Sequence, residues 1–167
     1  MKRSVLLLAL CVLGLSGCEW LKGKSSKDNL DPPAELVDFE TTAPVDRAWS
    51  RNLGDGIERS GTKPRPVEAD GIVYASDLDG SVFAIDLLSG KPRWSIEADK
   101  RLSSGPGVGE GLVVVGGLDG DVIALDRDSG SAKWTTKVSS EVLASPVIAG
   151  GIVVVRSGDG RVFGLSA

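Results

Sequence analysis

Two aspartates, Asp86 and Asp126, are the residues of this sequence best placed for acid–base chemistry. They lie forty positions apart in segments that otherwise match, so a regular fold would give them equivalent surroundings. A pair of carboxylates can serve as general acid and general base. Each aspartate nevertheless stands just before a Ser-Gly turn, where an aspartate commonly accepts hydrogen bonds from nearby backbone N–H groups. We therefore expect both aspartates to be structural, and we expect no catalytic residue.

Metal and phosphate sites are also weakly supported. The sequence contains no histidine, which excludes Ser–His and Cys–His pairs and an imidazole metal site. Residues 126–130 hint at a calcium loop, but the glycine falls at loop position five instead of six, and Lys137 stands at position twelve, where a bidentate acid is needed. Residues 105–111 are glycine-rich but lack the G-x-G-x-x-G spacing and a following helix. We expect no metal, no cofactor and no enzymatic activity.

Trp94 and Trp134 offer aromatic surfaces on which a ligand could stack. They also recur in register, because residues 79–94 return as residues 119–134, and a third copy opens at Asp159. A fixed period of this length is typical of repeat architectures. The same position in each repeat favours packing between neighbouring repeats over ligand binding.

Each repeat contains four short apolar runs separated by turns. In the first repeat the predicted strands are Pro66–Ala69, Ile72–Ser76, Ser81–Asp86 and Pro92–Glu97, with Asp-Gly or Ser-Gly turns between them. Runs such as residues 112–115 do not alternate with polar residues, so both faces of the strand should be covered. The connections are too short for crossover helices. The pattern therefore predicts an all-β fold, a β-propeller of four-stranded antiparallel blades with 40-residue repeats.

The first 17 residues resemble a lipoprotein signal peptide. Lys2 and Arg3 precede a short apolar run that ends at Leu15-Ser16-Gly17-Cys18, which resembles a bacterial lipobox. That resemblance implies that Cys18 is lipidated and becomes the mature N-terminus, and Glu19 after it favours the outer membrane. Cys11 is a poorer candidate because the apolar run would be truncated. The alternative is an ordinary signal peptide with a chance cysteine.

Residues 18–45 read as a lipidated N-terminus and flexible tether, because apolar residues are sparse and Asp31-Pro32-Pro33 disfavours regular pairing. Loss of the signal leaves 17 basic residues against 23 acidic ones, a net charge of −6. This balance argues against a nucleic-acid partner, which would require a basic stripe.

Residues 46–167 are expected to form an incomplete propeller, about three of eight blades, beginning at residues 65, 105 and 145. A lone strand at Arg47–Leu53, within the expected closing strand 46–53, resembles the fourth strand of a blade. It would close the ring by pairing with strands from a C-terminal segment. The third copy, with strands expected at Pro146–Ile148, Ile152–Arg156 and Val162–Leu165, lacks its fourth strand. We expect its Val153, Val155 and Phe163 to lie against water.

The repeats carry a motif that resembles the tryptophan-docking motif of quinoprotein-like propellers. In that family the tryptophan packs between blades, over the alanine and a glycine peptide. The third copy departs from the motif, with Gly164 and Ser166 at the alanine and aspartate positions. The structural docking residues that the resemblance implies are Ala84, Asp86, Gly90, Trp94, Ala124, Asp126, Gly130 and Trp134.

Together, the lipobox, the tether, the Ala48-Trp49-Ser50 segment and the blades resemble the N-terminal part of the BamB family of outer-membrane lipoproteins. The resemblance implies a non-catalytic scaffold of the machinery that inserts β-barrel proteins into the outer membrane, with BamA as its partner and a lipid anchor on the periplasmic face. It places the principal BamA-binding loop after the third blade, beyond Ala167. The alternative is a fragment of a PQQ-dependent dehydrogenase-like propeller, a class that uses calcium and often an adjacent cysteine pair.

Overall fold

The computed structural model describes residues 35, 37, 43–54 and 61–167. The chain divides into two units, Met1–Pro44 and Val45–Ala167, and the strands found among the described residues belong to the second. The predicted signal peptide, Cys18 and nearly all of the predicted tether lie outside the described residues. Among the described residues there is no helix long and apolar enough to cross a membrane.

Three small antiparallel sheets form the second unit. The first contains β1 (Val67–Ala69), β2 (Ile72–Ser76), β3 (Ser81–Asp86) and β4 (Pro92–Glu97) in that spatial order. The second repeats this order with β5 (Gly107–Gly109), β6 (Leu112–Gly116), β7 (Asp121–Asp126) and β8 (Ala132–Lys137). The third has β9 (Val147–Ala149), β10 (Ile152–Arg156) and β11 (Val162–Ser166). The predicted all-β blades and their 40-residue period are confirmed, with bounds shifted by one residue in places.

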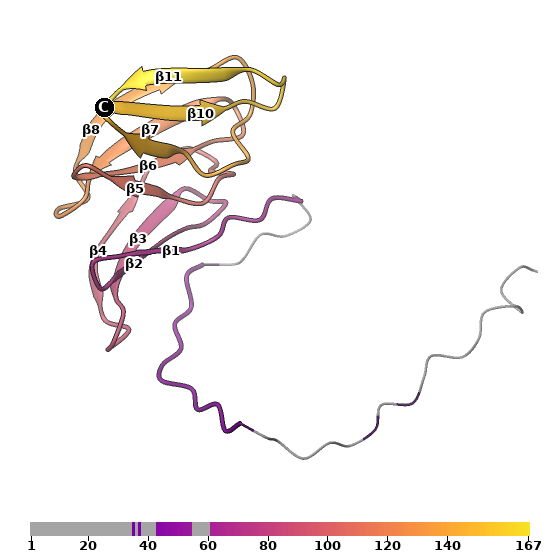
Figure 1. Cartoon of the computed structure of the whole chain (residues 1–167), viewed down its shortest axis with the longest axis vertical. Coiled ribbons are helices and arrows are strands. Elements are labelled where there is room, and N and C mark those ends of the chain that lie inside the picture. Colours follow the sequence, from indigo (N-terminus) through magenta and orange to yellow (C-terminus); the bar gives the residue numbers. More distant parts are fainter. Residues whose placement is uncertain (1–34, 36, 38–42, 55–60) are drawn as a thin grey trace, which may run out of the picture. The chain divides into compact units, whose positions relative to one another are not determined.

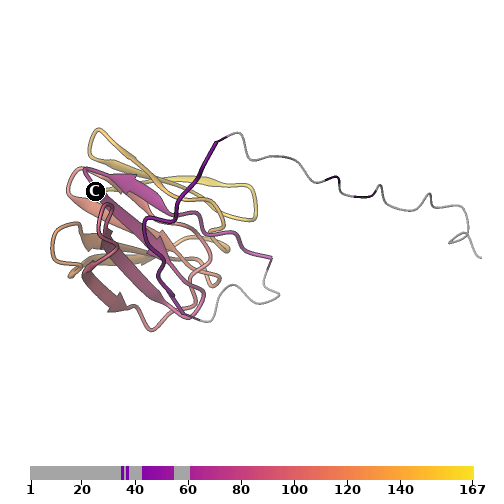
Figure 2. The same cartoon turned by 90° about the horizontal axis from the view of Figure 1, so that it is seen from below.

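The sheets stack face to face in chain order, the second between the first and the third (Figure 1), and they overlap when the stack is seen from below (Figure 2). Two apolar clusters join them. Val113 and Val115 of β6 pack toward the first sheet, in a cluster with Tyr74 and Leu125. Leu112 and Val114 belong to the other cluster, with Val153 and Val155 of β10. Because neighbouring residues of a strand point to opposite faces, one apolar strand serves both clusters.

The hairpins between inner strands use the predicted tight turns. Asp70 and Gly71, which connect β1 and β2, have φ angles of 51° and 76°. Positive φ at both central residues is the geometry whose twist matches that of the flanking strands. The turn therefore sets the register in which Ala69 faces Ile72 and Val67 faces Tyr74.

Residues 47–53 form no strand in the structure, and the pairing expected for the closing strand 46–53, with a C-terminal segment, stays a prediction. The expected exposure of Val153 and Val155 in the third blade is wrong, because the opposite face of β10 is the exposed one. Val153 and Val155 are fully buried against the second blade, whereas Val154 is 40% and Val162 66% exposed.

Candidate functional site

The tryptophan of one blade lies over the outer turn of the next. Trp94, at the centre of β4, donates its Nε1–H to the Arg127 carbonyl oxygen at 2.9 Å. The ring covers Gly130, where an added Cβ would lie 2.7 Å from Trp94 Cε3. Gly130 also has a φ of 73°, a conformation that side-chain-bearing residues rarely adopt. The turn therefore needs glycine for its backbone and for its contact with Trp94.

Trp49 makes the same contact with the first blade, although sequence reasoning did not place it in the docking set. Its Nε1–H donates to the Leu87 carbonyl oxygen at 2.8 Å, and a Cβ on Gly90 would lie 2.7 Å from its Cδ2. Leu87 and Arg127 occupy equivalent positions of the two repeats. The match of residues 47–53 to β4 is the sequence signal that places Trp49 at the position equivalent to Trp94.

Trp134 of β8 is the third docking tryptophan of this series. It is partly buried against the cluster that contains Val153 and Val155. Its Nε1 atom is buried and has no hydrogen-bond partner within the described part of the chain. The repeat period places Ala167 at the position of the carbonyl that accepts from the other two tryptophans.

Ala84 and Ala124 occupy the same position beneath the docking sites and are fully buried in the two clusters. In the ladders they lie opposite Trp94 and Trp134, and a β-bulge follows each alanine. A bulge increases the local twist of a strand. The outer strand of each blade is thus twisted at the position from which its tryptophan side chain extends toward the next blade.

Asp86 and Asp126 stabilise the outer turns through local contacts. Asp126 Oδ1 accepts hydrogen bonds from the Ser129 N–H at 3.0 Å and the Ser129 hydroxyl at 2.8 Å, and Lys133 Nζ lies 3.1 Å from Oδ2. These donors lower the pKa of Asp126 to about 2. Asp86 makes the same pair of bonds to Ser89, which lowers its pKa as well. A carboxyl held ionised in this way is poorly suited to exchange protons near neutral pH.

Polar contacts near the inner strands also join the blades. Arg127 Nη1 donates to Asp70 Oδ2 of the preceding blade at 2.8 Å. Glu110 reaches the following blade, where its two carboxylate oxygens accept from Gly150 N at 2.7 Å and Gly151 N at 2.9 Å. No sequence pattern indicates these pairs, because they join residues 40 or more positions apart that no motif connects.

The glycine-rich stretch at residues 105–111 has a packing role. Gly107 begins β5, and an added Cβ there would lie 2.1 Å from the Pro146 carbonyl oxygen of the third blade. A Cβ on Gly105 would lie 2.3 Å from the Arg65 carbonyl oxygen on the other side. The inner strands converge so closely that the middle blade has no room for side chains at these positions.

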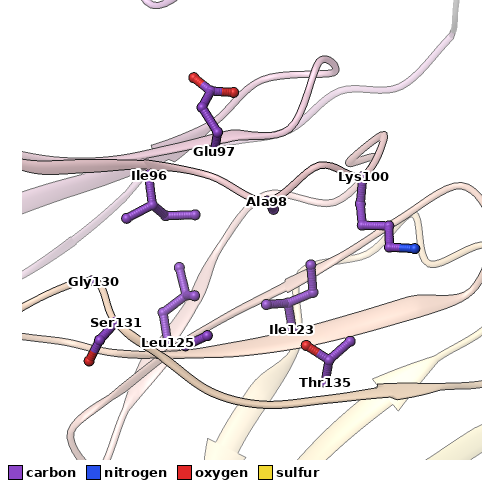
Figure 3. Close-up of a pocket in the computed structure, with 10 residues that line it drawn as sticks. Ile96, Glu97, Ala98, Lys100, Ile123, Leu125, Gly130, Ser131 and Thr135 are labelled. Carbon is purple, nitrogen blue, oxygen red and sulfur yellow. The ribbon is translucent and has the colours of Figure 1, made fainter.

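An open groove of about 330 Å³ lies between the outer parts of the first two blades (Figure 3). Ile96 and Ala98 line it from the first blade, and Ile123 and Leu125 from the second. Lys100 and Thr135 bring polar atoms to the same space. The described residues contain no group of three or more acidic or cysteine side chains arranged to hold a metal ion.

Comparison with known proteins points to one family. The model of a family described as outer membrane protein assembly factor BamB matches residues 78–167. The BamB protein of Xanthomonas campestris pv. campestris is 46% identical over 125 residues, which cover 66% of this chain and 31% of that protein. The crystal structure of BamB from Moraxella catarrhalis superposes with a TM-score of 0.58 at 27% identity, covering 64% of this chain and 33% of that one.

A quinohemoprotein alcohol dehydrogenase from Comamonas testosteroni shares the blade architecture, with a TM-score of 0.53 and 25% identity over 64% of this chain and 19% of the enzyme. The present chain spans about a third of the length of the BamB relatives named above.

Proposed function

Because the chain belongs to the family of outer membrane protein assembly factor BamB, we propose that it serves as part of a non-catalytic scaffold for the assembly of outer-membrane proteins. The family match over residues 78–167 carries this proposal. It covers β3 and β4, the whole second blade and the third blade. The matched range therefore includes Trp94, Trp134 and the whole apolar cluster that contains Val153 and Val155.

The geometry supports a binding platform. The two carboxylates best placed for acid–base chemistry, Asp86 and Asp126, are engaged by turn donors and cations. Stacked blades joined by buried clusters hold their connecting turns in fixed positions, and function in such folds resides in loops on a rigid framework. The relatives that match in sequence are named as assembly factors, which favours a scaffold over a dehydrogenase fragment.

A chimera tests this function directly. The matching 125-residue segment of the Xanthomonas campestris protein is replaced by the corresponding residues of this chain, in a strain that lacks its own BamB. We expect normal amounts of β-barrel proteins in the outer membrane. A matched control carries the equivalent blades of the Comamonas testosteroni dehydrogenase and should fail. A chimera that is folded and correctly located but does not restore assembly would contradict the proposal.

We further propose that the chain is anchored at the periplasmic face of the outer membrane through a lipid on Cys18. The support is the lipobox in the sequence and the outer-membrane role named for the relatives. Cells grown with a palmitate analogue should label the wild-type chain but not a Cys18→Ala variant. If Cys18→Ala remains in the membrane fraction at the wild-type level, the anchor lies elsewhere.

BamA is the proposed partner, with its principal contact beyond Ala167. A pull-down compares residues 18–167 with a form extended through the remaining blades, and only the extended form should capture BamA efficiently. Equal capture by the shorter form would move the contact to the first three blades, where the turns at residues 77–80 and 119–121 are the candidates.

A further inference from the structure

The groove between the first two blades arises where two blades separate toward their outer strands. Trp94 fills one part of this wedge by lying over Gly130. Farther along the chain, β4 presents Ile96, and Ala98, whose side chain ends at Cβ, follows just after the strand. Figure 3 shows the aliphatic side chains of Ile96, Ile123 and Leu125 directed into the space between the two blades.

Two departures from the repeat keep this space open. Val138 stands in the second repeat where Ala98 stands in the first, and Phe163 stands in the third where Ile123 stands in the second. Ile123 and Phe163 lie opposite Val115 and Val155 in their ladders, so they face the preceding blade in the same way. The space between the first two blades therefore has the smaller residue at both positions, Ala98 instead of valine and Ile123 instead of phenylalanine. Protein interiors are normally close-packed, and apolar cavities reduce stability, so an open apolar groove is a feature of binding sites.

Lys100 is the cation among the residues that line the groove. Its Nζ lies 4.0 Å from Oδ1 of Asp121, whose side chain is only 5% exposed, and Lys137 Nζ lies 3.8 Å from the same oxygen. One carboxylate therefore faces two ammonium groups. Glu97, the acidic residue that lines the groove, accepts a hydrogen bond from Ser81 and directs its carboxylate away from the apolar residues (Figure 3).

We propose that this groove binds a small apolar monocarboxylate, with an aliphatic chain between Ile96 and Leu125 and the carboxylate beside Lys100. The volume of about 330 Å³ lies at the lower end of the range for ligand pockets, which suits a fragment-sized molecule. The aliphatic wall supplies the apolar contact, and the Lys100 ammonium group, which shares the Asp121 carboxylate with Lys137, selects a negative charge over a positive one.

A titration with fatty acids of increasing length measures both contributions. The full chain, labelled with ¹³C at isoleucine and leucine methyl groups, is titrated with hexanoate, octanoate and decanoate, and with octylamine as the opposite-charge control. The Ile96, Ile123 and Leu125 methyl resonances should shift together. Affinity should rise about fourfold per added methylene until the chain outgrows the groove, because each buried methylene contributes about 0.8 kcal/mol. Octylamine should bind more weakly than octanoate.

Variants taken from the neighbouring repeats separate this site from non-specific binding. Ala98→Val and Ile123→Phe introduce side chains that the fold already accepts at equivalent positions. Each should weaken octanoate binding about tenfold or more, because the added atoms occupy part of the space that the ligand chain needs. Lys100→Gln should weaken octanoate about threefold, the scale of a partly exposed ion pair, and should strengthen octylamine, because the like charge beside it is removed.

Three results would overturn the proposal. The first is equal affinity for octanoate and octylamine, which needs no variant to fold. The second is octanoate binding that Ile123→Phe does not weaken. Methyl shifts spread over the exposed face of β10 and β11 would count in the same way, because both results indicate non-specific association. The third is a shift of the same methyl groups by an extended apolar peptide amide but not by octanoate, which would assign the groove to polypeptide.

Discussion

Gly130→Ala gives the sharpest test of the contact between blades. The new methyl group would lie 2.7 Å from Trp94 Cε3, 2.8 Å from Trp94 Cδ2 and 3.2 Å from Ile96 Cγ2. Carbon atoms in good contact are about 3.5–4.0 Å apart, so the ring must move away from the turn. Its hydrogen bond to the Arg127 carbonyl oxygen at 2.9 Å would then be weakened or lost.

Gly111 provides a matched control for the backbone. Its φ is 77°, close to the 73° of Gly130, but no atom lies within 4 Å of an added Cβ. Gly111→Ala therefore reports only the strain of a left-handed residue, about 1–2 kcal/mol, less the entropy that alanine removes from the unfolded chain. Gly130→Ala adds about 1–3 kcal/mol of overpacking and about 1 kcal/mol for the hydrogen bond. The two variants should differ in free energy of unfolding by about 2–4 kcal/mol.

Urea unfolding, followed by tryptophan fluorescence, measures this difference. With a dependence of about 1–3 kcal/mol per molar urea for a domain of this size, the two midpoints should be about 1–2 M apart. In a Trp94→Ala background, Gly130→Ala should cost no more than Gly111→Ala, because the clashing ring is gone. Equal midpoints for the two single variants would show that Trp94 does not rest on Gly130, and the docking scheme would have to be abandoned.

Other perturbations probe separate parts of the stack. Trp134→Ala should lower the free energy of unfolding, measured in urea, by about 3 kcal/mol. Trp134→Phe should cost far less, because it removes a buried N–H that has no partner among the described residues. If both variants lose the same stability, that N–H has an acceptor. The pKa of Asp126 is about 2 in the folded chain and 3.8 without contacts, so the stability that its ionised form contributes is complete above about pH 4 and lost as the pH falls toward 2. In thermal melts across this pH range, Asp126→Asn should flatten the dependence of the melting temperature on pH. An unchanged dependence would show that another group causes it. Val154→Thr with Val162→Lys should keep the chain monomeric at higher concentration in sedimentation velocity, unless association uses another surface.

The sequence was sufficient to predict the blades because their signals are local and repeated. Asp70-Gly71 could form only a narrow set of turns, and the unbroken apolar run at residues 112–115 required cover on both faces. Both features depend on neighbours within a few residues. Repetition at a fixed period then showed that they belong to one architecture.

The contacts between blades were harder to predict because they depend on which face meets the preceding blade. Val153 and Val154 are chemically identical, and only the stacking decides that the first is buried and the second exposed. The docking role of Trp49 depends on its reach to Leu87, 38 residues away, in place of a backbone ladder. The groove likewise depends on Ala98 and Ile123 meeting across two sheets, which neither residue reveals alone.

The direction of the tryptophan contacts has a consequence for the order in which the blades fold. Trp49 precedes the turn that it covers at Gly90, and Trp94 precedes the turn that it covers at Gly130. Domains that become available one after another generally fold with the N-terminal one first. When each new blade emerges, the aromatic ring that caps its outer turn is therefore already present on the blade before it. Nearest-neighbour stacking of this kind allows structure to propagate along the chain one repeat at a time, so each blade serves as the template on which the next one is added.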